Sequence, residues 1–340
     1  MCPLRLIPKI FLFDEEELVP EIRAQRILNK ARIPEMAGYM LANRDDYIFS
    51  AITASVDGDV RFWPVGSEGE SSRVGSLHID MRARFIINDG QHRRAAIEMA
   101  IRDEPKLGDE TIAVVFFLDR GLERSQQMFA DLNRYAIRPS RSLGLLYDHR
   151  SALSKLAKLV ALRSSAFKDV VELEKSTLSE RSHKLFTLSS IYSACAALLE
   201  GHESEDLNQA AERCIEYWDE LTKHFPEWEY VRQSKMTAGE VRRDFIHSHA
   251  IVLQVLGIVG RELLALPGGS WKKKLTALKK IDWARSNARL WEGRALIGGR
   301  VSKASHNVTL TTNLMKQQLG LELGPEELRV EKAFKRGRGT

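Results

Sequence analysis

The sequence has little of what marks secreted, membrane-spanning and disulfide-stabilised proteins. Its 340 residues include three cysteines, Cys2, Cys195 and Cys214, which form no Cys-x-x-Cys pair and are spaced too widely for the disulfide framework of a secreted domain. Nearly apolar runs such as Ala250 to Gly260 are too short to span a bilayer, and the N-terminus does not resemble a signal peptide. The sequence therefore predicts a cytoplasmic protein with no membrane partner.

Common catalytic and metal-binding motifs are also missing. The sequence contains neither the Gly-x-x-x-x-Gly-Lys-Ser/Thr loop of many nucleotide-binding proteins nor a Gly-x-Ser-x-Gly nucleophile turn. His247 and His249 fall on different faces of the helix expected there, so they cannot bind a metal as an i, i+4 pair would. We therefore expect no metal site built from histidine.

The positive charge is concentrated in one segment. From Trp271 to Lys303, ten lysines and arginines stand against two acids, a net charge of +8 (10 − 2), whereas the whole chain carries +5. The segment also holds Trp271, Trp283 and Trp291, and cations beside aromatic rings are typical of nucleic-acid surfaces. The tryptophans would equally suit a helical core, and the lysines a solvated face. The candidates for DNA contact in this segment are Lys272, Lys273, Lys274, Lys279 and Lys280.

Hydrophobic periodicity predicts an α+β fold, with a mixed-sheet N-terminal domain followed by an all-helical C-terminal domain. Asp57-Gly58 predicts a type I′ hairpin between strands Ile48–Val56 and Asp59–Val65. Further elements are expected at Pro34–Asn43 (helix), Ser76–Asp80 and Ala83–Asn88 (strands), 91–103 (helix) and Thr111–Leu118 (a strand buried on both sides).

The strand ending at Asn88, the helix over 91–103 and the strand Thr111–Leu118 are predicted to form a parallel βαβ unit. Ligands bind beyond the carboxyl ends of parallel strands. This topology would place Asp89–Arg94 beside Asp119–Arg124 at one edge of the sheet.

After Arg150 the composition is typical of helices. The clearest are expected at Thr187–Glu200, Gln209–Phe225 and Arg242–Leu266, and Thr309–Glu327 faintly resembles a helix-turn-helix. We therefore expect domains over residues 1–150 and 151–330, and a basic, flexible tail over residues 331–340.

The most informative stretch is Asp89-Gly90-Gln91-His92-Arg93, followed by Arg94, where a strand gives way to a helix. The free N–H groups and the dipole of a helix N-terminus favour phosphate, and arginine forks match phosphate oxygens. Residues 90–94 are therefore the candidate phosphate ligands. Asp89 and His92 are the catalytic candidates, with Asp89 also able to hold a divalent ion. In the alternative interpretation, Asp89 caps the helix and the arginines point into water.

This motif is the signature of the DGQHR proteins, and the chain resembles their DndB branch, which is associated with DNA phosphorothioate (sulfur) modification. The resemblance extends to Arg23–Asn29, Arg32–Pro34, Phe129–Asn133 and Thr309–Gly320. It implies a ParB- or sulfiredoxin-like N-terminal domain, and it adds Gln25, Arg26 and Asn133 to the phosphate-binding candidates. Arg134, Arg138 and Arg141 follow in sequence as further DNA-contacting candidates. ATP with Mg²⁺ is the cofactor that such a domain would take.

The resemblance implies a DNA-binding regulator of a phosphorothioate-modification gene cluster. The alternative is a ParB-like nucleotide-binding enzyme, an ATP hydrolase or a nucleotide-gated switch, acting in DNA modification or phage defence. A third possibility is a factor that assembles other DNA-modification proteins. The sequence leaves open which DNA site, nucleotide and oligomeric state apply, and whether modified DNA is sensed.

Overall fold

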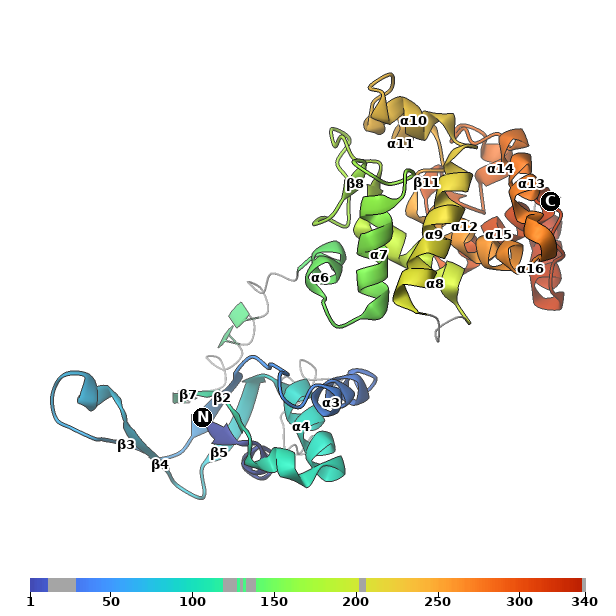
Figure 1. Cartoon of the computed structure of the whole chain (residues 1–340). Coiled ribbons are helices and arrows are strands. Elements are labelled where there is room, and N and C mark those ends of the chain that lie inside the picture. The colour runs from blue at the N-terminus through green and yellow to red at the C-terminus, as the bar shows by residue number, and fades with distance from the viewer. Residues whose placement is uncertain (12–28, 119–126, 129–130, 133–138, 202–205, 338–340) are drawn as a thin grey trace. The chain divides into compact units, whose positions relative to one another are not determined.

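The computed structural model describes residues 1–11, 29–118, 127–128, 131–132, 139–201 and 206–337 (Figure 1). Its contacts divide the chain into two units, Met1–Ile137 and Arg138–Thr340, each with its own hydrophobic core. Small sheets and a largely helical second unit confirm the predicted α+β class. The boundary at residue 137 assigns the helix α6, Arg141–Tyr147, to the second unit, whereas the sequence placed it in the first.

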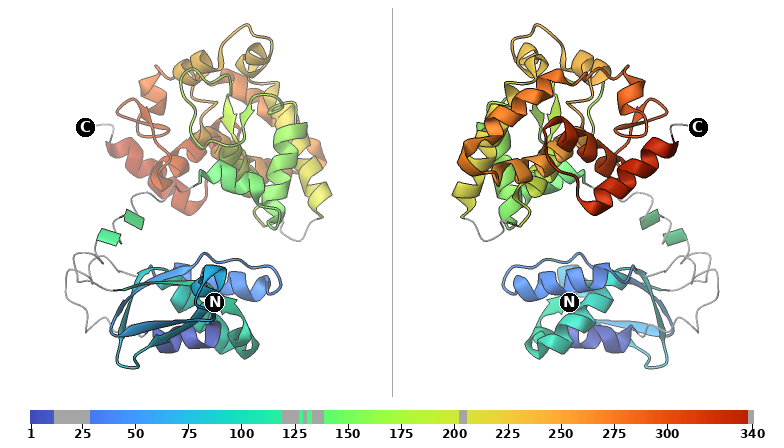
Figure 2. Two further views of the ribbon diagram at one scale, coloured as in Figure 1. Left: turned by 90° about the vertical axis from the view of Figure 1, so that its left-hand side faces the viewer. Right: turned by 90° about the vertical axis from the view of Figure 1, so that its right-hand side faces the viewer.

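The first unit packs its longer helices, α3 and α4, together on one side of a three-stranded sheet (Figure 2). Leu4, Ile7, Met40, Ile52 and Ile97 are among the side chains of its core. Its elements are β1 Cys2–Pro3, η1 Leu4–Leu6, α1 Ile7–Ile10, α3 Arg32–Ala42, β2 Ile52–Asp57, β3 Val60–Pro64, η2 Gly69–Arg73, β4 Gly75–Ile79, β5 Arg84–Asp89, α4 Gln91–Asp103, η3 Pro105–Asp109, β6 Thr111–Ile112 and β7 Val114–Leu118.

The central strand of the sheet is β2, which pairs with β5 on one side and β7 on the other. The predicted hairpin between β2 and β3 is wrong, because β3 pairs with β4 instead. A type I′ turn needs left-handed backbone at both central residues. Asp57 has no positive φ and Gly58 is extended at 159°, so the chain runs on past β2 without reversing.

The predicted parallel βαβ unit is also wrong. β5 is antiparallel to β2 and β7 is parallel to it, so β5 and β7 run in opposite directions. Asp89 lies opposite Thr53 at the start of β2, whereas Leu118 lies opposite Val56 near its end. Asp89 and Leu118 therefore lie at opposite ends of the strands. β7 is an edge strand with Leu118 54% exposed, and is not buried on both sides.

The strands β3 and β4 form an arm that stands apart from the three-stranded sheet (Figure 1). Nearly every residue of both strands is exposed, including Phe62, Trp63 and Leu77. The strands approach so closely at Gly75 that a Cβ there would lie 2.0 Å from the Trp63 carbonyl oxygen. The arm thus holds its shape through backbone pairing and turn geometry without burying a face.

The second unit is built around the buried helix α12. Its elements are α6 Arg141–Tyr147, α7 Ala152–Arg163, β8 Val171–Glu172, β9 Phe186–Thr187, α8 Leu188–Leu199, α9 Leu207–Thr222, α10 Pro226–Arg232, α11 Ala238–Asp244, α12 Ala250–Leu264, η4 Pro267–Gly269, α13 Trp271–Leu275, η5 Thr276–Lys280, α14 Ala288–Trp291, β10 Leu296–Ile297, β11 Arg300–Val301, α15 Ser305–Gln318 and α16 Pro325–Gly337.

The helix predicted over Arg242–Leu266 is interrupted between α11 and α12. Phe245 forms a β-bridge with Ala284, and the Ile246 N–H donates to the Trp283 carbonyl. These bonds to a distant segment replace the bonds that would continue the helix. His247 and His249 therefore do not lie on one helix, contrary to the sequence interpretation.

Among the described residues of the second unit, α12 packs closely against α8. A Cβ on Gly257 would lie 2.3 Å from the carbonyl oxygen of Ala194, so only glycine allows this approach. One turn later, Gly260 contacts the ring of Tyr217, whose hydroxyl donates to the Leu256 carbonyl at 2.6 Å. Small residues on α12 thereby let its neighbours come close to its backbone.

The C-terminal helix α16 is tied to the second unit by a buried ion pair. Arg294 Nη2 lies 2.6 Å from Glu331 Oε1, and both side chains are less than 10% exposed. Arg294 also stacks over the Phe334 ring. The flexible tail predicted from residue 331 is therefore corrected, because these contacts hold the chain helical as far as Gly337.

Replacing Gly257 with alanine tests the close packing of α12. We expect Gly257→Ala to lower the free energy of unfolding by about 2–3 kcal/mol, since the new methyl group clashes with backbone that cannot rotate away. Thermal unfolding followed by tryptophan emission measures it, because five of the six tryptophans belong to the second unit. The control is Gly144→Ala in α6, where an added Cβ would have no neighbour within 4 Å apart from the backbone of its own helix. It should be neutral or gain up to about 1 kcal/mol, and equal losses in the two variants would contradict the packing argument.

Candidate functional site

The Asp89–Arg94 turn joins β5 to α4 as the sequence predicted. Gly90 has a left-handed φ of 112°, which reverses the chain at little cost for glycine. Gly90, and not Asp89, is the N-cap of α4, and no side chain caps that helix in the described residues. The capping role considered for Asp89 is therefore not observed. The backbone N–H groups of the first turn stand at the positive end of a 13-residue helix.

Both arginines of the motif are held by the protein itself and do not point into water. Arg93 Nη2 donates to Asp89 Oδ2 at 2.7 Å and to the Ala51 carbonyl at 3.0 Å. Arg94 is buried, and it bonds to the Phe11 carbonyl at 2.9 Å and to Glu98 Oε2 at 2.6 Å. Arg94 thus joins Phe11, the residue after α1, to α4. Arg93 forms hydrogen bonds across the turn.

The remaining motif side chains divide between core and surface. Gln91 is buried and donates weakly to the Ile87 carbonyl at 3.4 Å. His92 Nε2 accepts the Asn29 N–H at 2.9 Å, which assigns the ring proton to Nδ1. Burial, followed by the charges of Arg32 and Arg93, lowers the pKa of His92. His92 is therefore a neutral ring with its Nε2 already engaged.

The contact between Asn29 and His92 brings the end of the segment preceding α3 to the turn. The charge of Arg32 acts on His92 as well. Other candidates expected near the turn, Gln25, Arg26, Asn133, Arg134 and Arg138, lie outside the described residues, as does Asp119–Arg124. Arg141 is described, in the second unit, where its guanidinium lies 5.5 Å from the centre of the Tyr192 ring.

The lysines of the basic segment lie on α13 and η5. Three of them are exposed and form no ion pair with an acidic residue in the described part of the chain: Lys273, Lys279 and Lys280. Lys272 pairs with Glu216 at 2.7 Å. Lys274 donates to the Gly320 carbonyl at 2.9 Å, where its charge meets the negative end of α15. The five lysines therefore lie close together in the chain, but Lys272 and Lys274 are engaged by other groups of the protein.

The tryptophans of the same segment belong to the core. Trp271, Trp283 and Trp291 are at most 8% exposed, and Trp283 stacks on Trp291 with ring centres 5.4 Å apart. The sequence left a stacking role on nucleic acid open, and this burial excludes it. Their function is to anchor the lysine-bearing helices against α12 and its neighbours.

The predicted helix-turn-helix corresponds to α15 and α16. The residues from Leu319 to Gly324 that link them are more than the roughly three to four of a helix-turn-helix turn. α15 is largely buried, and its Lys316 lies between Glu262 and Glu327. The two helices thus form a packed pair, in which α16 is the more exposed helix.

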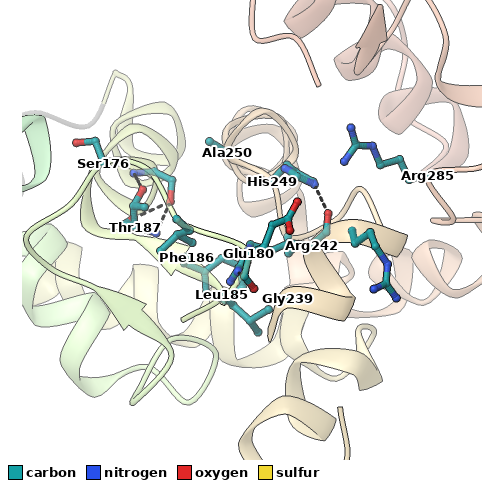
Figure 3. A pocket seen from close by; sticks show the side chains of 14 residues that line it. Ser176, Glu180, Leu185, Phe186, Thr187, Gly239, Arg242, His249, Ala250 and Arg285 are labelled. Carbon is teal, nitrogen blue, oxygen red and sulfur yellow. Dashed lines mark hydrogen bonds between the residues drawn. The ribbon is translucent and has the colours of Figure 1, made fainter. Parts of the chain in front are cut away.

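A pocket that the sequence did not indicate opens at the first turns of α8 and α12, with a volume of about 360 Å³ (Figure 3). Arg242, Arg285, His249 and Ser248 are among its lining residues. Burial lowers the pKa of His249 to about 4, and its Nε2 lies 2.9 Å from the Arg242 carbonyl. A capping-box sequence at Thr187 and Ser190 marks the start of α8. The break that creates the start of α12 has no comparable local signal.

No helix in the described ranges is both long and apolar enough to cross a bilayer, and no cluster of three or more potential metal ligands occurs there. The described structure is that of an α+β protein with two units. Its most distinctive local feature is the start of α4, which follows Gly90 and carries Arg93 and Arg94. Residues 1–322 match the family model DndB, described as DNA-sulfur modification-associated, and the chain belongs to this family. No curated protein and no solved structure matches the chain.

The buried neutral histidine predicts an acid-sensitive second unit. His249 binds a proton more readily when unfolded, with a pKa near 6.5, than when folded, with a pKa of about 4. Its contribution, about 3 kcal/mol, is therefore complete above pH 6.5 and is lost as the pH falls towards 4. In thermal unfolding scans, His249→Gln should flatten the decline in Tm over this range. Replacing the exposed His149 with Gln should leave the slope unchanged, and identical slopes for the two variants would contradict the assignment.

Proposed function

We propose that the chain is a DNA-binding regulator of a DNA sulfur-modification gene cluster, and that exposed lysines of the second unit contact DNA phosphates. Membership of a DNA-sulfur modification-associated family supports the biological setting. The observation that carries the proposal is the group Lys273, Lys279 and Lys280, which is exposed and held on helices anchored by buried Trp271 and Leu278.

Such a surface suits phosphate contact more than base recognition. Lysine ammonium groups neutralise phosphates and release condensed counterions, which yields affinity with little sequence preference. The tryptophans that could have stacked on bases are buried. α16 adds Lys332, Lys335 and Arg336 at the surface of the same unit. Sequence selectivity would then come from a surface outside the lysine group, and α16 is our candidate for it.

The first test replaces Lys273, Lys279 and Lys280 together with glutamine. We expect weaker binding to the promoter DNA of the gene cluster, and a slope of log K against log salt that is shallower by about one per lost phosphate contact. Fluorescence anisotropy at several salt concentrations measures both quantities. A matched triple variant of the exposed Lys155, Lys168 and Lys235 removes equal charge elsewhere on the unit. Equal losses in the two triple variants would show that net charge alone matters.

A second candidate function is nucleotide binding at the Asp89–Arg94 turn, in a domain we propose to be ParB- or sulfiredoxin-like. The start of α4, uncapped by side chains in the described residues, favours it, because N–H groups there can receive phosphate oxygens. Arg93 Nε is buried without a hydrogen-bond partner in the described structure. Asp89, half-exposed, would hold Mg²⁺ once its pairing with Arg93 opens. His92 is the other catalytic candidate, although its Nε2 is engaged.

ATP turnover tests this second candidate. If the turn holds phosphates, Arg93→Ala should lower turnover at least tenfold, since a bidentate donor to the phosphates is lost. Arg82→Ala is the control, because Arg82 is exposed and pairs only locally with Asp80 among the described residues. Background turnover in the native chain, or equal rates in both variants, would remove the enzyme interpretation.

A further inference from the structure

We propose that the pocket at the first turns of α8 and α12 binds the phosphate group of a small molecule. This site is distinct from the lysine group and from the Asp89–Arg94 turn, and it does not depend on DNA binding. Three features of its walls carry the inference: two converging helix N-termini, two arginines without carboxylate partners, and a buried hydroxyl without a hydrogen bond.

The two helices start at the pocket and run away from it in the same direction. Thr187 and Ser190 at the start of α8 line it together with His249 and Ala250 at the start of α12. Gly257 lets the helices pack closely along this shared direction. Each N-terminus carries roughly half a positive charge, and parallel dipoles side by side repel each other. An anion at the shared end would offset the positive charge of the two N-termini and the repulsion between the two dipoles.

The start of α12 is the more open of the two. Thr187 and Ser190 form a capping box at α8, whereas no side chain caps the 15-residue α12 in the described structure. In Figure 3, Ala250 lies between Thr187 on one side and Arg285 on the other. The uncapped N–H groups of α12 and the guanidinium of Arg285 can therefore serve one ligand.

The arginines give the pocket an excess of positive charge. Arg285 donates to the Gly299 carbonyl, and Arg242 donates to carbonyls of the Ser179–Lys184 loop. Neither forms an ion pair with a carboxylate among the described residues. Arg243, the third arginine of the lining, is neutralised by Asp244 at 2.8 Å, and Glu180 is exposed. Arg285 keeps spare donors that match phosphate oxygens, whereas both terminal nitrogens of Arg242 are engaged by the loop carbonyls, so that Arg242 contributes mainly its charge.

Ser248 supplies an independent indication of a ligand. It lines the pocket and is 4% exposed, and its hydroxyl is buried without a hydrogen-bond partner in the described structure. Leaving a buried hydroxyl unpaired is costly, and such groups are rare. The hydroxyl is covered in the unliganded pocket, and rotation of the Ser248 side chain would turn it towards a phosphate oxygen that accepts this hydrogen bond.

The size of the pocket indicates more than a free ion. A volume of about 360 Å³ lies within the range of small-molecule sites. Leu178, Leu185 and Phe186 add an apolar wall beside the arginines. The ligand class that fits is a phosphate monoester of a small organic molecule, of which a nucleoside monophosphate is an available probe.

The test measures binding of inorganic phosphate and of adenosine monophosphate to the full chain, by calorimetry and by the shift in Tm. Chloride at equal ionic strength is the reference. We expect both phosphates to raise Tm beyond chloride, with the monophosphate binding more tightly. Arg285→Gln should weaken binding at least tenfold and Ser248→Ala several-fold. Arg163→Gln, which removes an exposed arginine paired with Glu212 outside the pocket, should have no effect.

A second variant keeps the test decisive if Arg285→Gln fails to fold. Ala250→Asp places a carboxylate in the first turn of α12, where it should raise Tm without phosphate and remove the response to phosphate. The proposal is overturned if phosphate acts no more strongly than chloride, or if Ala250→Asp retains the full response. It is also overturned if a DNA duplex displaces the monophosphate, because the pocket would then belong to the DNA surface.

Discussion

The close contact between α8 and α12 is the constraint on which the second unit depends. Gly257 brings the backbones of two helices together without an intervening side chain, and this fixes their direction and their relative height. Because both helices then begin at one level, their free N–H groups and the loops before them converge. The core and the polar pocket are consequences of the same packing, and a sequence change that separates the helices would affect both.

The structure assigns the most conspicuous sequence motif a mechanical role in addition to any chemical one. Arg94 joins the segment after α1 to α4, although these are more than eighty residues apart in the chain. Arg93 and Asp89 brace each other across the turn. A motif of this kind can be preserved in a family because the domain needs it to close, whatever ligand it receives. Any ligand at the turn must compete with, or rearrange, these existing bonds.

Local patterns predicted local structure well, and pairings poorly. Gly90 located the start of α4 and the Pro105–Asp109 segment its end, and β-branched runs located the strands. The partners of β2 were missed, because strand direction is set by tertiary packing and leaves no mark in the strand itself. The break before α12 was missed for the same reason: it depends on hydrogen bonds to Trp283 and Ala284. The pocket could not be predicted, since it depends on that break as well as on the packing of α8 against α12.

The β3–β4 arm has a consequence for how the first unit behaves in solution. Its strands bury almost nothing, so they contribute little to the free energy of unfolding, yet they carry Trp63 and Phe62 into water. Stability and solubility are thereby governed by different residues of one domain. Apart from Gly75, the arm can vary in sequence with little effect on the core, and such variation would alter self-association first.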